Sequence, residues 1–218
     1  MNSQDEKLYE KLQDWFKELD ATVIDLHTRR QIFREVQEIL LSNEKVFNNH
    51  FTYYLNDWYG TAMAISIRAL VDKDEKTRSY ARFLTCIAKN ENCILRSRYL
   101  EKWKNKETGN HAFNEFAGEN SDKLDVALIE DDLKELNDKT KIVRDYTDKA
   151  IAHLDKRGAP IIPKWADFDE AIDCLGKLHQ KYFRLLDGGN TSLTTSIGYD
   201  WKELFRFAWL PAKEPEVW

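Results

Sequence analysis

Residues 145–157 read DYTDKAIAHLDKR and close the longest helical pattern in the chain. Val143, Tyr146, Ala150 and His153 recur at spacings of three and four residues, so they share one stripe of a helix. A titratable histidine therefore stands on a face where apolar residues are expected. Two interpretations are open: His153 takes part in binding or chemistry, or it is a core residue satisfied by a neighbouring carbonyl or carboxylate.

Helical patterns fill the chain on both sides of this stretch. No segment shows the alternation of a strand, and the whole sequence has only 8 Gly and 4 Pro. We therefore predict one all-α domain over residues 1–218, a bundle of long up-and-down helices with short peripheral helices. The predicted helices span residues 4–41, 51–71, 78–89, 93–104, 122–154, 167–186 and 200–207. Residues 107–120 are predicted as an irregular loop, and Ser121 as the N-cap of the helix that follows.

Composition excludes several classes of function. The net charge of −5 argues against a protein that coats nucleic acid by bulk electrostatics, although a local basic groove is compatible with it. Three cysteines, Cys86, Cys93 and Cys174, have no metal-like spacing, and no glycine-rich phosphate loop or nucleophile motif is present. We expect no metal and no cofactor. The charged N-terminus and the lack of a long apolar run predict a cytoplasmic protein without membrane contact.

Basic residues alternate with aromatic ones in the predicted helix over residues 93–104. Such a pattern suits a phosphate backbone whose bases stack on rings, and it also describes an ordinary amphipathic surface helix. The predicted nucleic-acid-binding residues are Arg96, Arg98, Lys102, Arg144 and Arg157.

Arg68 is a charge within the small, apolar run GTAMAISIRALVD. An unpaired buried charge is costly, so Arg68 needs a partner. Either it pairs with Asp72, one turn later, or it is presented to a functional site.

Three stretches together resemble a known family. They are SIRALVDKDEKTRSYARFL (66–84), DKAIAHLD (148–155) and the C-terminal YDWKELF (199–205), which is followed by Trp-Leu-Pro. Their order resembles the HEPN superfamily (higher eukaryotes and prokaryotes nucleotide-binding), and within it the abortive-infection U-type branch. The resemblance spans most of the chain.

The resemblance implies a helical bundle that dimerises through the helices carrying the His motif. Many members are metal-independent ribonucleases that act as toxins or in phage defence, often beside a nucleotidyltransferase that serves as antitoxin. In these, a histidine acts on the ribose 2′-hydroxyl or the leaving oxygen, and an arginine shortly before it stabilises the phosphorane. The partners implied here are RNA or a nucleotide, a second copy of the chain, and such an antitoxin.

The chain departs from this pattern where the motif arginine is expected. Those positions hold Tyr146, Thr147 and Asp148, none of which is basic. Lys149 shares the helix face of His153 and offers a positive charge without the fork of a guanidinium. The candidate catalytic residues are therefore His153, Lys149, Arg68 and Asp148.

Three functions follow as hypotheses. The first is an abortive-infection or toxin-type protein that binds RNA or a nucleotide at a cleft around the His-bearing helix. The second is an active metal-independent endoribonuclease with His153 as its acid and base. The third is a bundle that binds other proteins and catalyses nothing.

Overall fold

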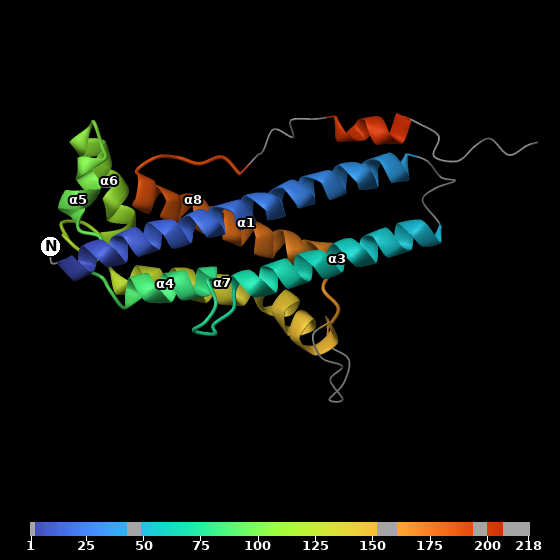
Figure 1. The fold of residues 1–218 in the computed structure, drawn as a ribbon, viewed down its shortest axis with the longest axis horizontal. Helices are drawn as coiled ribbons and strands as arrows, with labels where there is room; N and C mark the ends of the chain where they lie inside the picture. The colour runs from blue at the N-terminus through green and yellow to red at the C-terminus, as the bar shows by residue number, and fades with distance from the viewer. Residues whose placement is uncertain (1–2, 43–48, 152–160, 194–199, 207–218) are drawn as a thin grey trace, which may run out of the picture.

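The computed structural model describes residues 3–42, 49–151, 161–193 and 200–206, and these ranges contain helices and no strand (Figure 1). The prediction of an all-α fold is confirmed. The helices are α1 (Ser3–Leu41), α3 (His50–Leu70), α4 (Tyr80–Ala88), α5 (Arg96–Glu101), α6 (Lys106–Ala117), α7 (Val126–Tyr146), a π turn (Thr147–Ile151), α8 (Trp165–Asp187) and a 3₁₀ helix (Trp201–Arg206). His153 and Arg157 lie outside the described residues.

The long helices form two layers. Helices α1 and α3 run side by side in opposite directions, with α7 and α8 behind them, and α5 and α6 cover the end where α1 begins (Figure 1). Helix α7 packs against α8, α4 and α3, while α1 packs against α8. The stripe of α1 that includes Leu12, Leu19 and Leu26 is buried between these layers. Burial of this continuous apolar surface stabilises the bundle.

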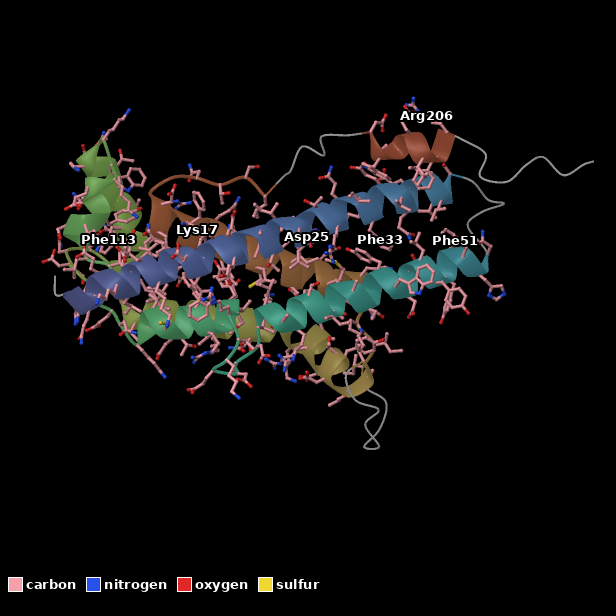
Figure 2. All side chains as sticks on the ribbon, in the orientation of Figure 1. Lys17, Asp25, Phe33, Phe51, Phe113 and Arg206 are labelled. Carbon is pink, nitrogen blue, oxygen red and sulfur yellow. The ribbon has the colours of Figure 1, made fainter. Side chains whose placement is uncertain are left out.

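Aromatic rings join the helices along the bundle. Phe16 of α1 stacks on His179 of α8 with ring centroids 4.7 Å apart, and Phe83 of α4 meets Tyr182 edge to face. Further along, Phe33 of α1 lies against Tyr59 of α3, with 3.6 Å between ring centroids (Figure 2). Such pairs add to the burial of apolar area and fix the positions of the helices relative to one another.

The prediction of a loop over residues 107–120 is wrong, because α6 occupies Lys106–Ala117. The side chain of Asn105 caps it, accepting from the backbone N–H of Glu107 at 3.0 Å. Phe113 is fully buried (Figure 2). Gly109 lies inside the helix because a Cβ there would stand 2.8 Å from the side chains of α5 and the residues that follow it. The glycine permits close packing and does not break the helix.

Helix α7 begins later than the sequence predicted. Its N-cap is Asp125, whose carboxylate accepts from the N–H of Ala127 at 2.9 Å, and Ser121 lies before it in a turn. The backbone between Ser121 and Asp125 makes hydrogen bonds to other segments: the N–H of Asp125, for example, donates to the carbonyl of Phe116 at 2.7 Å. These tertiary hydrogen bonds prevent the helix from starting at residue 122.

Helix α8 begins two residues before its predicted start. The backbone N–H of Lys164 donates to the carboxylate of Asp167 at 2.6 Å, which satisfies one of the free donors at the helix N-terminus. At the other end Gly188 adopts a left-handed conformation and closes the helix. The early start brings Trp165 into the first turn, where it faces α3.

Within the described ranges, every helix is too short or too polar to cross a membrane.

Candidate functional site

The end of α7 is attached to α3 by three consecutive residues. Tyr146 lines a pocket beside α3, and the hydroxyl of Thr147 donates to the carbonyl of Val143 at 2.8 Å and lies 3.3 Å from that of Ala64. Asp148 accepts a hydrogen bond from Nε of Arg68 at 2.6 Å. The segment that leads toward His153 is therefore fixed to the bundle up to Asp148.

Arg68 pairs with Asp72, as one of the two alternatives predicted, and also with Asp148. Its guanidinium lies 2.6 Å from the carboxylate of Asp148 and 3.4 Å from that of Asp72, with 30% of its side chain exposed. The hydrogen bond to Asp148 raises the pKa of Arg68 above its ordinary value. Arg68 and Asp148 thus meet, as an ion pair. Contact of Arg68 with a phosphate stays a prediction.

The remaining catalytic candidates lie on the π turn or beyond it. Lys149 is exposed and makes no ion pair with another described residue. His153 follows two residues after the turn ends and is outside the described ranges. A π turn widens a helix by one residue, and such turns are frequent at functional sites. The sequence pattern predicted an ordinary helix here, because side-chain periodicity does not report a local widening of the backbone.

Arg96, from the predicted nucleic-acid-binding set, is the centre of an internal network. Its guanidinium donates to oxygens of Ser121 at 2.7 Å, Asn114 at 2.9 Å and Gly118 at 3.1 Å, and to both oxygens of Asn110. It also lies over the ring of Phe113, 4.7 Å from the centroid. These contacts hold α5, α6 and the turn before α7 together.

The other basic residues at α5 also contact neighbouring helices. The ammonium of Lys102 donates to the carbonyl of Leu186, at the end of α8, and to the hydroxyl of Tyr9. Burial of that ammonium lowers the pKa of Lys102 to about 8. Arg98 lies over the ring of Tyr9, 4.0 Å from its centroid. Arg96, Arg98 and Lys102 therefore share one corner of the bundle, which we call the α5 corner.

Arg144 is far from that corner, near the end of α7 (Figure 1). Its guanidinium lies 3.4 Å from the side-chain oxygen of Asn137 and 3.8 Å from the carboxylate of Asp145. The predicted nucleic-acid-binding residues thus fall in two separate places, with Arg157 outside the described ranges. Their role in binding RNA stays a prediction.

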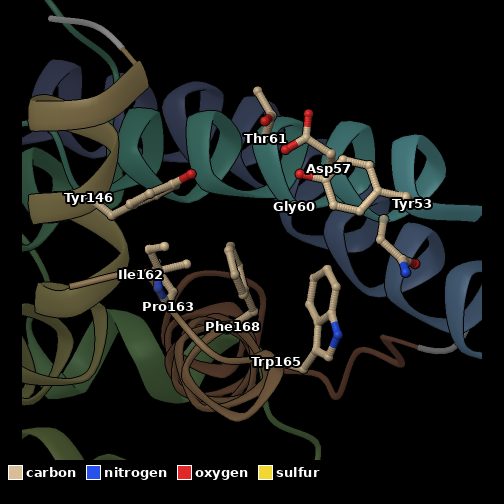
Figure 3. A pocket seen from close by; sticks show the side chains of 10 residues that line it. Tyr53, Asp57, Gly60, Thr61, Tyr146, Ile162, Pro163, Trp165 and Phe168 are labelled. Atoms are coloured by element: carbon tan, nitrogen blue, oxygen red, sulfur yellow. The ribbon is translucent and has the colours of Figure 1, made fainter. Parts of the chain in front are cut away.

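A pocket of about 320 Å³ opens beside the end of α7 (Figure 3). We call it the α3–α8 pocket, because these helices form two opposite walls. Its lining residues come from α3, the end of α7, the connector and the start of α8, and are Tyr53, Asn56, Asp57, Gly60, Thr61, Tyr146, Ile162, Pro163, Trp165 and Phe168. Its volume is at the lower end of the range for small-molecule sites, about 300–1,000 Å³.

The two walls of the α3–α8 pocket differ in chemistry. Trp165 and Phe168 form the α8 wall, and Trp165 remains 45% exposed (Figure 3). The α3 wall carries the carboxylate of Asp57 and the hydroxyl of Thr61, neither of which has a hydrogen-bonding or ionic partner among the described residues. The arrangement offers a flat ligand an aromatic surface on one side and a polar edge on the other.

This pocket is not evident from the sequence. Its only signal was the pair Asn56-Asp57 within the aromatic run YYLNDWYG, on a helix face that reads as ordinary exposed surface. That Trp165 faces the pair follows from the tertiary packing of α8 on α3. Among the described residues, no group of histidine, cysteine, aspartate and glutamate side chains has the geometry of a metal site.

Comparison with known proteins identifies the family. A family model described as AbiU2, of the HEPN type, matches residues 9–208 of the chain. No curated protein and no solved structure matches the chain. The match covers most of the 218 residues, and the all-helical bundle agrees with it. The chain therefore belongs to the HEPN superfamily, in its AbiU2 branch.

Proposed function

We propose that this abortive-infection-related HEPN protein binds RNA or a nucleotide at the α3–α8 pocket and the adjoining end of α7. The observation that carries the proposal is the pocket itself. Aromatic rings stand opposite polar groups that lack partners among the described residues, and the size suits one base. Proteins hold an unpaired base in this way, by stacking and by hydrogen bonds to its edge.

A test of this proposal measures binding by the full chain. We expect labelled single-stranded RNA, and nucleoside monophosphates at higher concentration, to bind the wild type. Trp165→Ala should weaken that binding by about 10-fold, since stacking of a base on an aromatic ring contributes about 1–3 kcal/mol. Trp201→Ala, on the 3₁₀ helix and outside the pocket lining, is the matched control. If neither RNA nor a nucleotide binds the wild type, the proposal is wrong.

A metal-independent endoribonuclease is the second candidate function. The observation that favours it is Lys149, an exposed cation on the π turn, four residues before His153. In that mechanism His153 moves a proton to or from the 2′-hydroxyl or the leaving oxygen, and Lys149 stabilises charge on the phosphate. Arg68 and Asp148 would position the turn through their ion pair.

Cleavage in the presence of EDTA separates the two functions. If the wild type cuts RNA and His153→Ala does not, the chain is a ribonuclease. Binding without cleavage in either protein supports the binding function alone. Absence of both activities favours the third hypothesis, a bundle that interacts with other proteins.

The partners inferred from the family are part of the proposal. A homodimer is expected to appear by sedimentation at micromolar concentration. If the chain is a toxin, its expression alone should arrest growth. If a neighbouring nucleotidyltransferase is the antitoxin, its co-expression should relieve that arrest. Growth that expression leaves unchanged would contradict the toxin hypothesis.

A further inference from the structure

The charge of the α3–α8 pocket limits what enters it. Among the described residues that line the pocket, Asp57 is the only acidic or basic one, and its carboxylate lies on the α3 wall (Figure 3). A phosphate beside it would be repelled, because two like charges in a partly enclosed site interact unfavourably. The part of a nucleotide that occupies the pocket is therefore the uncharged base, with its phosphate directed to solvent.

Asn56 and Thr61 supply hydrogen-bond donors beside this carboxylate on α3. The oxygen of the Asn56 amide accepts from Nε2 of Gln37 at 2.5 Å, so the NH₂ group of this lining residue is the part of the amide that can donate to a ligand. The hydroxyl of Thr61 also lines it. An organic cation in an aromatic cage would interact with the acceptor Asp57, and the donors of Asn56 and Thr61 would make no hydrogen bond to it. A planar ligand edge that carries both donors and acceptors uses all three groups.

The opposite wall suits a flat ring. Trp165 packs on Phe168 with ring centroids 5.7 Å apart, and its indole lies 3.6 Å from the position that a Cβ on residue 60 would take. Because residue 60 is glycine, the edge of the indole comes close to the α3 backbone. A heteroaromatic ring stacked on the exposed face of the indole would therefore present its edge to α3, the helix that carries Asp57.

Guanine matches this edge better than the other bases. An ionised carboxylate only accepts hydrogen bonds, and it binds most strongly to two donors side by side. Guanine has such a pair, N1–H and the 2-amino group, next to the acceptor O6. Adenine, cytosine and uracil each place an acceptor next to their single donor group on this edge.

We propose that the α3–α8 pocket selects guanine, with the carboxylate of Asp57 accepting from N1–H and the 2-amino group. Asn56 and Thr61 donate to the acceptors of the same base, and Trp165 stacks on its face. This inference rests on the proposed function, because it names the base that the nucleotide-binding site takes.

The test compares the binding of GMP, IMP, AMP and UMP to the full chain. We expect GMP to bind about 10-fold or more tightly than AMP and UMP, as for a bidentate contact that distinguishes bases. IMP, which lacks the 2-amino group, should fall between them. Asp57→Asn should weaken GMP binding by a similar factor and strengthen binding of xanthosine monophosphate, whose C2 oxygen accepts from the new amide. Asp131→Asn, near the start of α7, is the matched control and should change neither.

The possible outcomes separate this inference from the proposed function. If the four nucleotides bind equally, or Asp57→Asn weakens all of them alike, guanine selection is wrong and nucleotide binding stands. If RNA binds the wild type and no nucleotide does, guanine selection by the pocket is wrong and RNA binding stands; if neither binds, the proposed function fails as well. Binding of choline that competes with GMP and depends on Asp57 would show a cation site and overturn the inference. Circular dichroism of both variants confirms that they fold.

Discussion

Two regions of the bundle, the α5 corner and the α3–α8 pocket, both hold polar and aromatic residues and use them differently. At the α5 corner, Arg96 and Lys102 direct their donors at oxygens of the same chain. At the α3–α8 pocket, Asp57 and Thr61 have no partner among the described residues, and Trp165 is half exposed. The α5 residues hold helices together, and the pocket residues are available to a ligand. A sequence pattern of basic and aromatic residues therefore indicates the residue types that a binding site needs. It does not indicate whether those side chains already contact other parts of the same chain.

The strongest test of this difference is Arg96→Ala. It leaves the carbonyls of Ser121 and Gly118 and the amide of Asn114 without their donor. We expect the free energy of unfolding to fall by about 2–4 kcal/mol, since a hydrogen-bonded charge is lost from a network. Arg96→Lys should keep only part of the stability that Arg96→Ala loses, because an ammonium lacks the planar, forked donors of a guanidinium. Urea denaturation measures both changes.

Lys104→Ala is the matched control for the α5 corner. Lys104 is exposed and makes no ion pair with a described residue, so its removal should change stability by less than about 0.5 kcal/mol. If Arg96→Ala instead keeps its stability and loses RNA binding, the comparison is wrong and α5 is a binding surface.

A second prediction concerns His27 of α1, another basic group enclosed by the fold. The pKa of His27 is lowered to about 4, mainly because the ring is buried and to a smaller extent because the positive charge of Arg30 is near. The carboxylate of Asp173 opposes this shift. The unfolded chain therefore binds more protons than the folded chain between about pH 6.5 and 4. The contribution of the neutral His27 to the free energy of unfolding is fully present above about pH 6.5, and it should be lost as the pH drops through this range. The loss should be about 2 kcal/mol, less than the full shift implies, because solvent screens part of the ring.

Thermal denaturation as a function of pH measures this loss. His27→Gln should flatten the profile between about pH 6.5 and 4, and the remaining slope should include His179, whose pKa is also lowered by burial. His50→Gln, which changes an exposed histidine, should leave the profile as it is in the wild type. An unchanged profile in His27→Gln would show that His27 is not protonated on unfolding in this range.

The same comparison explains how far the sequence could predict the molecule. The stripe of Leu12, Leu19 and Leu26 repeats at helical spacing, so long helices and an all-α bundle follow from it. Helix α6 did not follow, because glycine disfavours helices in general and only the close approach of α5 explains Gly109 here. Helix existence depends on local pattern, whereas the role of one glycine depends on tertiary contacts.

The site was harder to predict for a related reason. Asp57 occupies an exposed helix face and is indistinguishable in sequence from a solvated carboxylate. Only the packing of α8 on α3 places Trp165 opposite it. Arg68 shows the converse: the sequence required a partner for it and offered Asp72, and the structure adds Asp148, 80 residues away in the chain.

A third prediction concerns Gly60, which lines the α3–α8 pocket and lies next to the indole of Trp165. Gly60→Ala places a methyl group 3.6 Å from the indole, an ordinary contact, and should raise stability by about 0.5–1 kcal/mol, because alanine favours a helix interior over glycine. Gly60→Leu extends into the pocket and should weaken nucleotide binding by about 10-fold without unfolding the chain. Titration calorimetry on the two variants distinguishes filling of the pocket from a change in α3. Equal affinity in both would show that the ligand binds elsewhere.

The smallest expected effect is at the ion pair between Arg68 and Asp148, which joins the π turn to α3. Both side chains are partly exposed, so Asp148→Asn should reduce the free energy of unfolding by less than about 1 kcal/mol. Its effect should instead be local: hydrogen exchange should become faster in the π turn, because the carboxylate that anchors the turn to Arg68 has lost its charge. Asp145→Asn, one turn earlier and paired with Lys141 on the same helix, is the matched control. If Asp148→Asn leaves exchange in the π turn unchanged, the contacts of Thr147 alone hold this segment to α3.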